Sequence, residues 1–467
     1  MYRRNFLQAA AASLGTGVLP ALLTGAARAQ SSGYRALVCI FLYGGNDGTN
    51  TIVPRDATRY TQYASVRKQL ALPASSLLPL NADWGLHPAL AGLSTAWAEQ
   101  ALAPVFNVGP LFQPLTRNEY LNARALGKTA PQSLFSHYHQ QLLWETAHHD
   151  VSRRSGWGGR AAATRSGLVM SGTSTSRFGL TEQATPVVFP APGAVFGVQG
   201  YWGGPNATRR SALQALHDEA SGQMLQTAYA KSQREAMVLA DQLGPILRIN
   251  PKDNPGEPIN VAFAPVTDSS GRLTTELARQ LYQIAKLIEY RASLPTTVGN
   301  ASGHVYFAAL GGFDTHGNQI GNDVLSGDHA TLLKTLGDAM GAFYQATKTL
   351  GLASGVTTFT QSDFGRTSVS NASRGTDHGW GNHHLVMGGS VIGNTTYGTY
   401  PSLVLGGPDD AGGPVWEQQG RWIPTASVDQ YTATLLRWWG LDETQLSGLL
   451  PNLVNFGSAR SLGFLRA

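Results

Sequence analysis

Two apolar runs in the sequence end in the same way, at a pair of glycines followed by an acidic residue. Residues 36–43 precede the glycine pair before Asp47, and residues 304–310 precede the glycine pair before Asp314. An unbroken apolar run of this length predicts a strand buried on both faces, as in a parallel sheet. Because the loops that follow such strands share one edge of the sheet, we expect both acids at that edge.

Further apolar and amphipathic segments alternate along the chain. They predict strands at 103–108, at 356–360 and from residue 385, and helices near 208–243, 273–294, 330–352 and 428–439. This alternation predicts an α/β fold with one doubly wound, mostly parallel sheet flanked by helices. No linker divides residues 30–467, so we expect one domain, with residues 155–300 as a helical and loop elaboration that shapes or covers a site.

Residues 1–29 have the pattern of a twin-arginine export signal. Arg3 and Arg4 precede an apolar Ala/Leu/Gly stretch, which ends at Ala27-Arg-Ala29. Several glycines and a proline dilute that stretch, so it is too weakly apolar for a membrane anchor. We therefore expect cleavage after residue 29, export through the twin-arginine machinery, a periplasmic or secreted location and no stable membrane anchor.

Charge and cysteine content narrow the classes of partner. The signal contains three of the 34 Lys and Arg residues and none of the 29 Asp and Glu residues, so its removal lowers the net charge from +5 to about +2. That balance does not indicate a nucleic-acid partner. Cys39 is the single cysteine, so the chain cannot form an internal disulfide. It lies within an apolar run, where burial makes a reactive thiol unexpected.

The densest group of metal-binding residue types lies between the strands expected at 356–360 and from 385. Asp377 and His378 are adjacent, and His383 and His384 follow within a glycine-rich segment. Neutral imidazole together with carboxylate suits zinc or a similar divalent ion. The alternative is a polar loop with solvated histidines, but two such pairs so close together favour the metal.

Three loops therefore supply metal-binding side chains to the same predicted edge. The first carries Asp47, which also suits a simple Asp-Gly turn, the second carries Asp314 and His316, and the third carries the Asp377–His384 group. Two metal ions roughly 4 Å apart, as in two-metal hydrolases, need about six such ligands, which is the number that these loops supply.

One further residue, Ser136, is a candidate for the chemistry itself or for local structure. It is expected near the start of a helix, where backbone N–H groups favour an anion, although the spacing alone favours an ordinary N-cap role. His383 and His384 are adjacent. If a strand begins there, their side chains point to opposite faces and only one of them, with a slight preference for His384, reaches the site.

Several motifs together resemble a family of exported bacterial proteins known only as a domain of unknown function, number 1501. They are Tyr-Arg-Arg-x-Phe-Leu, Phe-Leu-x-Gly-Gly-x-Asp-Gly, Leu-Phe-Ser-His, Gly-Gly-Phe-Asp-Thr-His, Asp-Phe-Gly-Arg-Thr and Thr-Asp-His-Gly-Trp-Gly-Asn-His-His. The resemblance extends over about residues 33–465. The family is distantly similar to the alkaline phosphatase and sulfatase superfamily, which implies an alkaline-phosphatase-like fold.

The resemblance implies a role for each candidate. Ser136 is the candidate nucleophile and Arg366 a candidate oxyanion partner. One metal ion is assigned to Asp47, Asp377 and His378, and a second to Asp314, His316 and one of His383 or His384. Asp314 and His316 are spaced more closely than the corresponding pair in phosphatases, and His139 stands where related chains tend to carry an acid.

The expected function is hydrolysis of a phosphate or sulfate ester, in a small molecule or a polymer, by a hydroxyl nucleophile assisted by divalent ions. Zinc is the first expectation, with manganese, calcium or magnesium as alternatives. The sulfatase branch is disfavoured because the sequence has no Cys/Ser-x-Pro-x-Arg motif. The competing hypothesis is a secreted binding protein without catalysis that keeps the fold and one structural metal.

Overall fold

A large mixed sheet forms the centre of the molecule. The computed structural model describes residues 33–197, 205–219, 223–300 and 302–466, and the expected signal at residues 1–29 lies outside them. Within this part of the chain the sheet has eight strands in the order β11-β5-β10-β9-β1-β8-β6-β7. They are β1 (Arg35–Leu42), β5 (Leu102–Gly109), β6 (Met170–Ser171), β7 (Val187–Val188), β8 (Gly303–Leu310), β9 (Val356–Ser362), β10 (Asn382–Met387) and β11 (Ala426–Ser427).

The sheet is mostly parallel, as predicted. β1 pairs in parallel with β8 and β9, and β5 with β11, whereas β10 is antiparallel to both β5 and β9. Leu42 lies in register with both Leu310 and Ser362, so the three central strands end at the same level. The loops that follow β1, β8 and β9 therefore begin side by side.

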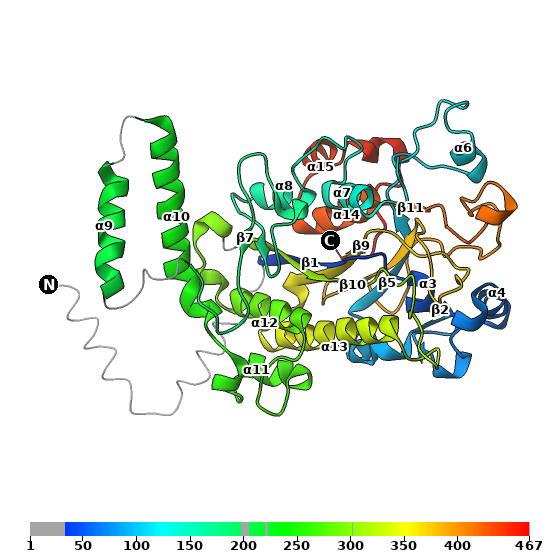
Figure 1. Ribbon diagram of the computed structural model, residues 1–467, viewed down its shortest axis with the longest axis horizontal. Helices are drawn as coiled ribbons and strands as arrows, with labels where there is room; N and C mark the ends of the chain where they lie inside the picture. The colour runs from blue at the N-terminus through cyan, green and yellow to red at the C-terminus, as the bar shows by residue number, and fades with distance from the viewer. Residues whose placement is uncertain (1–32, 198–204, 220–222, 301, 467) are drawn as a thin grey trace.

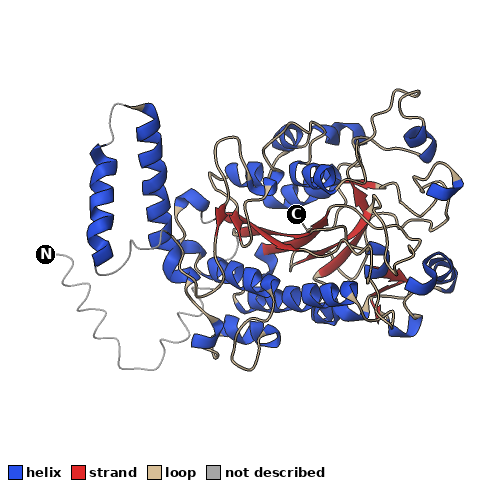
Figure 2. Ribbon diagram, in the orientation of Figure 1, coloured by secondary structure: helices blue, strands red, loops and turns tan. Residues whose placement is uncertain are grey.

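Helices cover both faces of the sheet, which confirms the prediction of a sheet flanked by helices (Figures 1 and 2). One face packs against α5 (Ser94–Ala98), α10 (Met224–Leu247), α11 (Pro258–Phe263), α12 (Glu276–Glu289) and α13 (Asp328–Thr349). The other face packs against α7 (His137–Thr146), α8 (Trp157–Ala163), α14 (Val428–Trp439) and α15 (Glu443–Leu449). Side chains of β1 alternate between the two cores, with Val38 and Ile40 in the first and Cys39 and Phe41 in the second.

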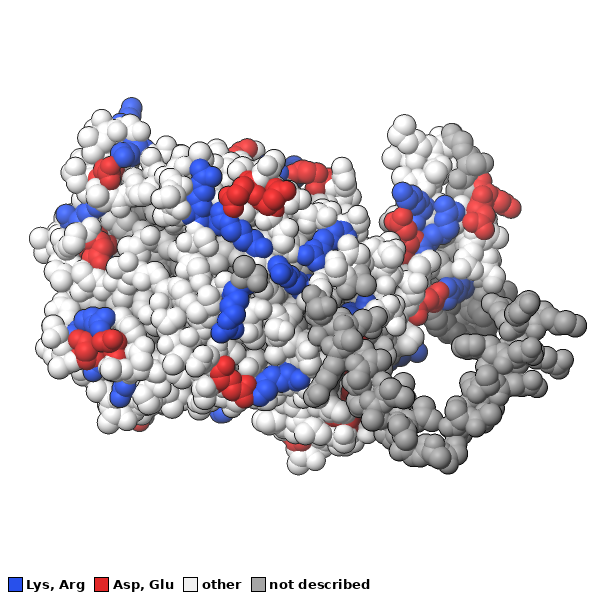
Figure 3. Space-filling view, turned by 180° about the vertical axis from the view of Figure 1, so that it is seen from behind, with Lys and Arg blue, Asp and Glu red and all other residues white. Residues whose placement is uncertain are grey.

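Smaller elements complete the fold. The helices α3 (Gly48–Thr51), α4 (Ala57–Arg67) and α6 (Arg117–Leu121) lie in the loops, and a three-stranded antiparallel sheet contains β2 (Ile52–Pro54), β3 (Leu78–Pro79) and β4 (Trp84–Leu86). Among the residues that the structure describes, no helix combines the length and the apolar character needed to cross a membrane. On the face that Figure 3 shows, basic and acidic side chains are interspersed.

Residues 155–300 form part of the main sheet and of its core, so they are more than the predicted elaboration around a site. β6 and β7 extend the main sheet from β8, and α12 packs against α13 in one of the two cores. The helix predicted near 208–243 is two helices, α9 (Pro205–Glu219) and α10, which stand out from one side of the molecule (Figure 1). The weak helix formers Ser221 and Gly222 lie in the sequence between them.

Candidate metal centre

The loops after β1 and β9 both approach the loop after β8 closely because glycines leave room for them. Gly44 has a φ of +114°, and a Cβ there would lie 2.3 Å from the backbone nitrogen of Asp314. A Cβ on Gly375 would lie 2.4 Å from the carbonyl group of His316. These close approaches require glycine and bring the segment that carries Asp377 against the loop that carries Asp314.

A short antiparallel pairing holds the third loop in place. Arg366 and His378 form an isolated β-bridge, and Thr367 N–H donates to the Asp377 carbonyl at 2.9 Å. The chain that leaves β9 thus folds back on itself before β10 begins. This hairpin directs the His378 side chain towards the loop that follows β8.

Three ligand atoms meet where these loops converge. The Nε2 atoms of His316 and His378 are 2.9 Å apart, and the Oδ1 atom of Asp314 lies 3.1 Å from the first and 3.3 Å from the second. Around a tetrahedral zinc ion with bonds of about 2.0–2.2 Å, neighbouring ligand atoms are separated by roughly 3.3 Å. The triangle therefore has the size of one face of a zinc coordination sphere.

The protons on these two imidazoles lie on the opposite nitrogens. His378 Nδ1 is 2.7 Å from the Phe135 carbonyl, and His316 Nδ1 is 2.9 Å from Oδ1 of Asp377. A carbonyl and an ionised carboxylate only accept, so each Nδ1 is the donor and, in a neutral ring, each Nε2 presents a lone pair. Two lone pairs at 2.9 Å repel unless a cation lies between them. In metal-binding histidines, the ring nitrogen that does not bind the metal usually donates a hydrogen bond, which fixes the tautomer.

The charges around the triangle favour a bound cation. Burial on its own raises the pKa of Asp314. The hydrogen bond and charge of Arg366, together with the charges of His316 and His137, outweigh burial, so the pKa lies below its ordinary value. For Asp377, burial is likewise outweighed by hydrogen bonds from Asn371 and His316, so its pKa is lowered. Burial lowers the pKa of His378, which keeps this imidazole neutral. Ionised carboxylates and neutral imidazole are the forms that bind metals.

His137 is a fourth member that the sequence did not single out. One ring nitrogen and an oxygen of Asp314 are 3.5 Å apart, and His137, Asp314 and His378 each offer a ligand atom within 4.8 Å of the others. The second ring nitrogen, Nδ1, lies 2.6 Å from Oδ2 of Asp363, and this hydrogen bond raises the pKa of His137. Asp363 also accepts from Gln141, one turn further along α7. The sequence feature that could have identified His137 is the Leu-Phe-Ser-His motif, in which it directly follows the candidate Ser136.

Arg366 lies beneath the cluster and positions Asp314. Its guanidinium group is fully buried and donates to Asp314 Oδ1 at 2.8 Å, to the Gly44 carbonyl at 3.1 Å, and to the Thr376 side chain and carbonyl. With four of its five N–H groups engaged in this way, Arg366 connects all three loops. These hydrogen bonds hold Asp314 in position, which fits Arg366 better than the predicted role as an oxyanion partner.

Asp47 lies outside the cluster. Its side chain is fully buried, and Oδ2 accepts from Arg67 and, at 2.5 Å, from Gln319. Burial raises its pKa, but the charges of Arg67 and His329 and the hydrogen bonds from Arg67 and Gln319 together outweigh burial, so the pKa is lowered. Gln319 also accepts from Thr376, the residue before Asp377. Asp47 therefore contacts the metal-binding loops through Gln319 while its charge is balanced by Arg67.

His383 and His384 also lie outside the cluster, in β10, and they point to opposite faces of the sheet as predicted for a strand. His383 accepts from the Asn107 N–H at 3.0 Å and lies against Phe106. The ring of His384 lies against Trp144 in the other core, 4.7 Å between centroids. Burial lowers the pKa of each to about 3, so both are neutral.

Ser136 lies at the margin of the cluster. It is the N-cap residue of α7, between Phe135, whose carbonyl binds His378, and His137. Its hydroxyl makes no capping hydrogen bond and instead lies 3.2 Å from Nδ1 of His139. A hydroxyl beside an imidazole is the arrangement in which a base can activate a nucleophile.

One comparison with known proteins bears on these loops. Residues 299–445 match the profile of a family described as "Protein of unknown function (DUF1501)". The matched part contains Asp314, His316, Arg366, Asp377 and His378, so this part of the predicted resemblance is supported. No curated protein matches the chain.

A buried acid on α7, two turns beyond His137, predicts how stability depends on pH. Glu145 is 4% exposed and accepts from the Tyr43 hydroxyl at 3.0 Å, and burial raises its pKa from 4.5 to about 7. A raised carboxyl pKa gives stability that is complete below pH 4.5 and is lost as pH rises through 7. Between pH 4.5 and pH 8, the free energy of unfolding of the unmodified protein should therefore fall by about 3 kcal/mol relative to that of Glu145→Gln.

Thermal unfolding of both proteins at several pH values between 4 and 8 measures this difference. Taking the difference between the two proteins cancels the contribution of Asp429, a second buried acid whose pKa burial also raises to about 7. A stability difference that is constant across this range would mean that Glu145 does not titrate there.

Proposed function

We propose that this chain is a metal-dependent hydrolase of phosphate or sulfate esters with an alkaline-phosphatase-like arrangement. The observation that carries the proposal is the convergence of the Nε2 atoms of His316 and His378 on Asp314, with both Nδ1 atoms already bonded to oxygen acceptors. His137 forms a second, overlapping trio with Asp314 and His378, and imidazoles with a carboxylate suit zinc. When bound, such an ion stabilises negative charge on a phosphoryl or sulfuryl oxygen.

The remaining groups fit ester hydrolysis. The side chains of Asp314 and His316 are 45% and 46% exposed, so a substrate can reach them. Ser136 Oγ is the candidate nucleophile, and His139 Nδ1 is close enough to take its proton as the bond from Oγ to phosphorus or sulfur forms. The bond from phosphorus or sulfur to the ester oxygen breaks as that oxygen takes the proton from His139 and leaves as the alcohol. Water then hydrolyses the Ser136 ester, which restores the Ser136 hydroxyl and releases the phosphate or sulfate. Arg366 keeps Asp314 ionised and correctly oriented throughout.

The ligands that the structure brings together are sufficient for one ion. Asp47, expected to bind the first ion, and His383 and His384, one of which was expected to bind the second, lie elsewhere. Our proposal therefore requires one ion at the Asp314 cluster, and metal analysis of the purified protein tests whether a second is present.

A substrate panel tests the proposed activity. The purified protein is assayed on an aryl phosphate, an aryl phosphodiester and an aryl sulfate, before and after chelation and after return of zinc, manganese, calcium or magnesium. We expect metal-dependent turnover of at least one ester, and Ser136→Ala should lower kcat by at least about a hundredfold because the nucleophile is lost. Ser152→Ala, an exposed serine outside the cluster, is the matched control.

One result would count against the hydrolase, and another against the nucleophile alone. If no ester is hydrolysed with any of the metals, the binding-protein hypothesis with a structural ion is the better account. If turnover is metal-dependent but unchanged in Ser136→Ala, the hydrolase proposal stands and the assignment of the nucleophile fails.

A further inference from the structure

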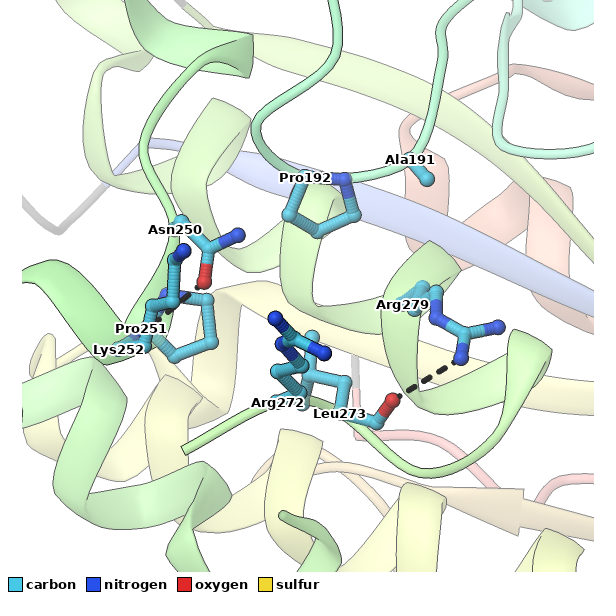
Figure 4. A pocket seen from close by; sticks show the side chains of 8 residues that line it. All are labelled: Ala191, Pro192, Asn250, Pro251, Lys252, Arg272, Leu273 and Arg279. Atoms are coloured by element: carbon cyan, nitrogen blue, oxygen red, sulfur yellow. Dashed lines mark hydrogen bonds between the residues drawn. The ribbon is translucent and has the colours of Figure 1, made fainter. Parts of the chain in front are cut away.

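A small pocket that shares no residue with the metal centre lies where three loops meet α12. Its volume is about 210 Å³. The walls come from the segment after β7, from a short 3₁₀ helix at Pro251–Asp253, from the loop before α12 and from α12 itself. The side chains that line it are Ala191, Pro192, Asn250, Pro251, Lys252, Arg272, Leu273 and Arg279 (Figure 4).

The polar groups that face this pocket are hydrogen-bond donors. Asn250 Oδ1 already accepts from the Lys252 N–H at 3.2 Å, and the Leu273 carbonyl accepts from Arg279 at 3.1 Å. Within the described part of the chain, no hydrogen bond or ion pair engages the Asn250 amide nitrogen or the charged ends of Lys252 and Arg272, although Arg272 lies close enough to Asp268 for their charges to interact. Figure 4 shows the Arg272 guanidinium between Asn250 on one side and Arg279 on the other.

Two glycines with positive φ build the pocket before any ligand arrives. Gly271 has a φ of +74°, and a Cβ there would lie 3.2 Å from Cα and Cβ of Lys252. Gly193 has a φ of +83°, and a Cβ there would lie 3.0 Å from the Asn250 amide nitrogen. The positive φ favours glycine at both positions, and an added Cβ would displace the neighbouring Lys252 or Asn250 by a few tenths of an ångström.

The nearby acids do not occupy the pocket. Asp268 accepts from the backbone N–H groups of Ser270 and Arg272 within its own turn, which also fixes the backbone of Arg272. Glu276 pairs with one nitrogen of Arg279 at 2.7 Å, and no carboxylate is among the lining residues. Three cationic side chains and an amide therefore face a space without a negative group.

We propose that this pocket binds a small oxyanion, namely a phosphate or sulfate group. Arginine side chains hold such groups through paired, charge-assisted hydrogen bonds, and lysine adds a point charge. The volume is below the roughly 300–1,000 Å³ of pockets for drug-sized ligands, so it suits one anionic group rather than a whole large molecule. This second site is independent of the metal centre and of the proposed hydrolysis.

Isothermal titration calorimetry of the full, purified protein in a buffer without oxyanions tests the proposal, and it is carried out before and after chelation so that binding and hydrolysis at the metal centre are separated from binding at the pocket. The probes are inorganic phosphate, inorganic sulfate and glucose 6-phosphate, with chloride at equal ionic strength as the control. We expect saturable binding of phosphate or sulfate, and none of chloride. Each of Arg272→Gln and Arg279→Gln should weaken binding at least about tenfold, because a charged donor is lost. Arg124→Gln, an exposed arginine far along the sequence, should leave binding unchanged.

The same preparations are assayed for ester hydrolysis and for thermal stability. Binding that persists at full strength in Arg272→Gln, or no saturable binding by the unmodified protein, would overturn the oxyanion site. Because Arg272 lies outside the metal cluster, hydrolysis should be unchanged in this variant. Failure of the oxyanion site and failure of the proposed hydrolase are therefore separate outcomes. Tighter binding of glucose 6-phosphate than of inorganic phosphate would support an esterified anion as the natural ligand.

Discussion

The His378→Ala protein is expected to purify without the metal ion and to lose ester hydrolysis by several orders of magnitude. His378 Nε2 lies 2.9 Å from that of His316 and 3.3 Å from Oδ1 of Asp314, so its removal opens one corner of the ligand triangle. An ion that stabilises charge on the reacting oxygens is lost with it. His316→Ala should behave in the same way. Metal content by mass spectrometry and kcat on the best ester measure both effects.

Other histidines provide matched controls. His384→Ala and His383→Ala remove buried imidazoles from β10, outside the cluster, so each should lower stability but keep the metal. His149→Ala removes an exposed imidazole beyond the end of α7 that hydrogen-bonds Asn452 at 2.9 Å, so it should keep the metal and cost only a little stability. Equal loss of metal from His378→Ala and from His384→Ala would contradict the assignment of ligands.

Asp47→Asn is expected to lower the free energy of unfolding by about 3–5 kcal/mol while the protein keeps its metal ion. The Asp47 and Arg67 side chains form a fully buried ion pair, and Arg67 also donates to the carbonyls of Thr367 and Ser368. Without the carboxylate, the buried charge of Arg67 has no counter-ion. Denaturant unfolding measures the loss, and metal analysis of the folded protein measures occupancy.

A double substitution separates the ion pair from other effects of the change. Asp47→Leu combined with Arg67→Met removes both charges, and it should be less destabilising than Asp47→Leu alone because no buried charge remains unpaired. If Asp47→Asn instead keeps its stability and loses metal, Asp47 is a ligand and the ion-pair account of this residue is wrong.

Much of the fold was predictable because long strands and helices have clear periodicity. The apolar runs at 36–43 and 304–310 correspond to β1 and β8, and their common edge followed from the rule for parallel sheets. β6 and β7 were missed because each has two residues, too few for any pattern. The break between α9 and α10 was missed because the apolar spacing continues across it.

The candidate site was predictable only in part, because its contacts are long-range. Asp314, His316, Asp377 and His378 were named from their positions after strands, and the structure brings them together. Asp47 occupies the same kind of position as Asp314, but Arg67, in α4, neutralises it, which the spacing of acids cannot reveal. His137 reaches the site from α7 through Asp363, 226 residues away in the sequence.

Crystals grown with zinc and measured at the zinc absorption edge test the central claim most directly. The account predicts one anomalous peak about 2.0–2.2 Å from the Nε2 atoms of His316 and His378 and from a carboxylate oxygen of Asp314. An empty position there, with the two Nε2 atoms still about 3 Å apart, would mean that a shared proton rather than a metal ion joins the imidazoles. That result would contradict the metal centre and, with it, the proposed hydrolase.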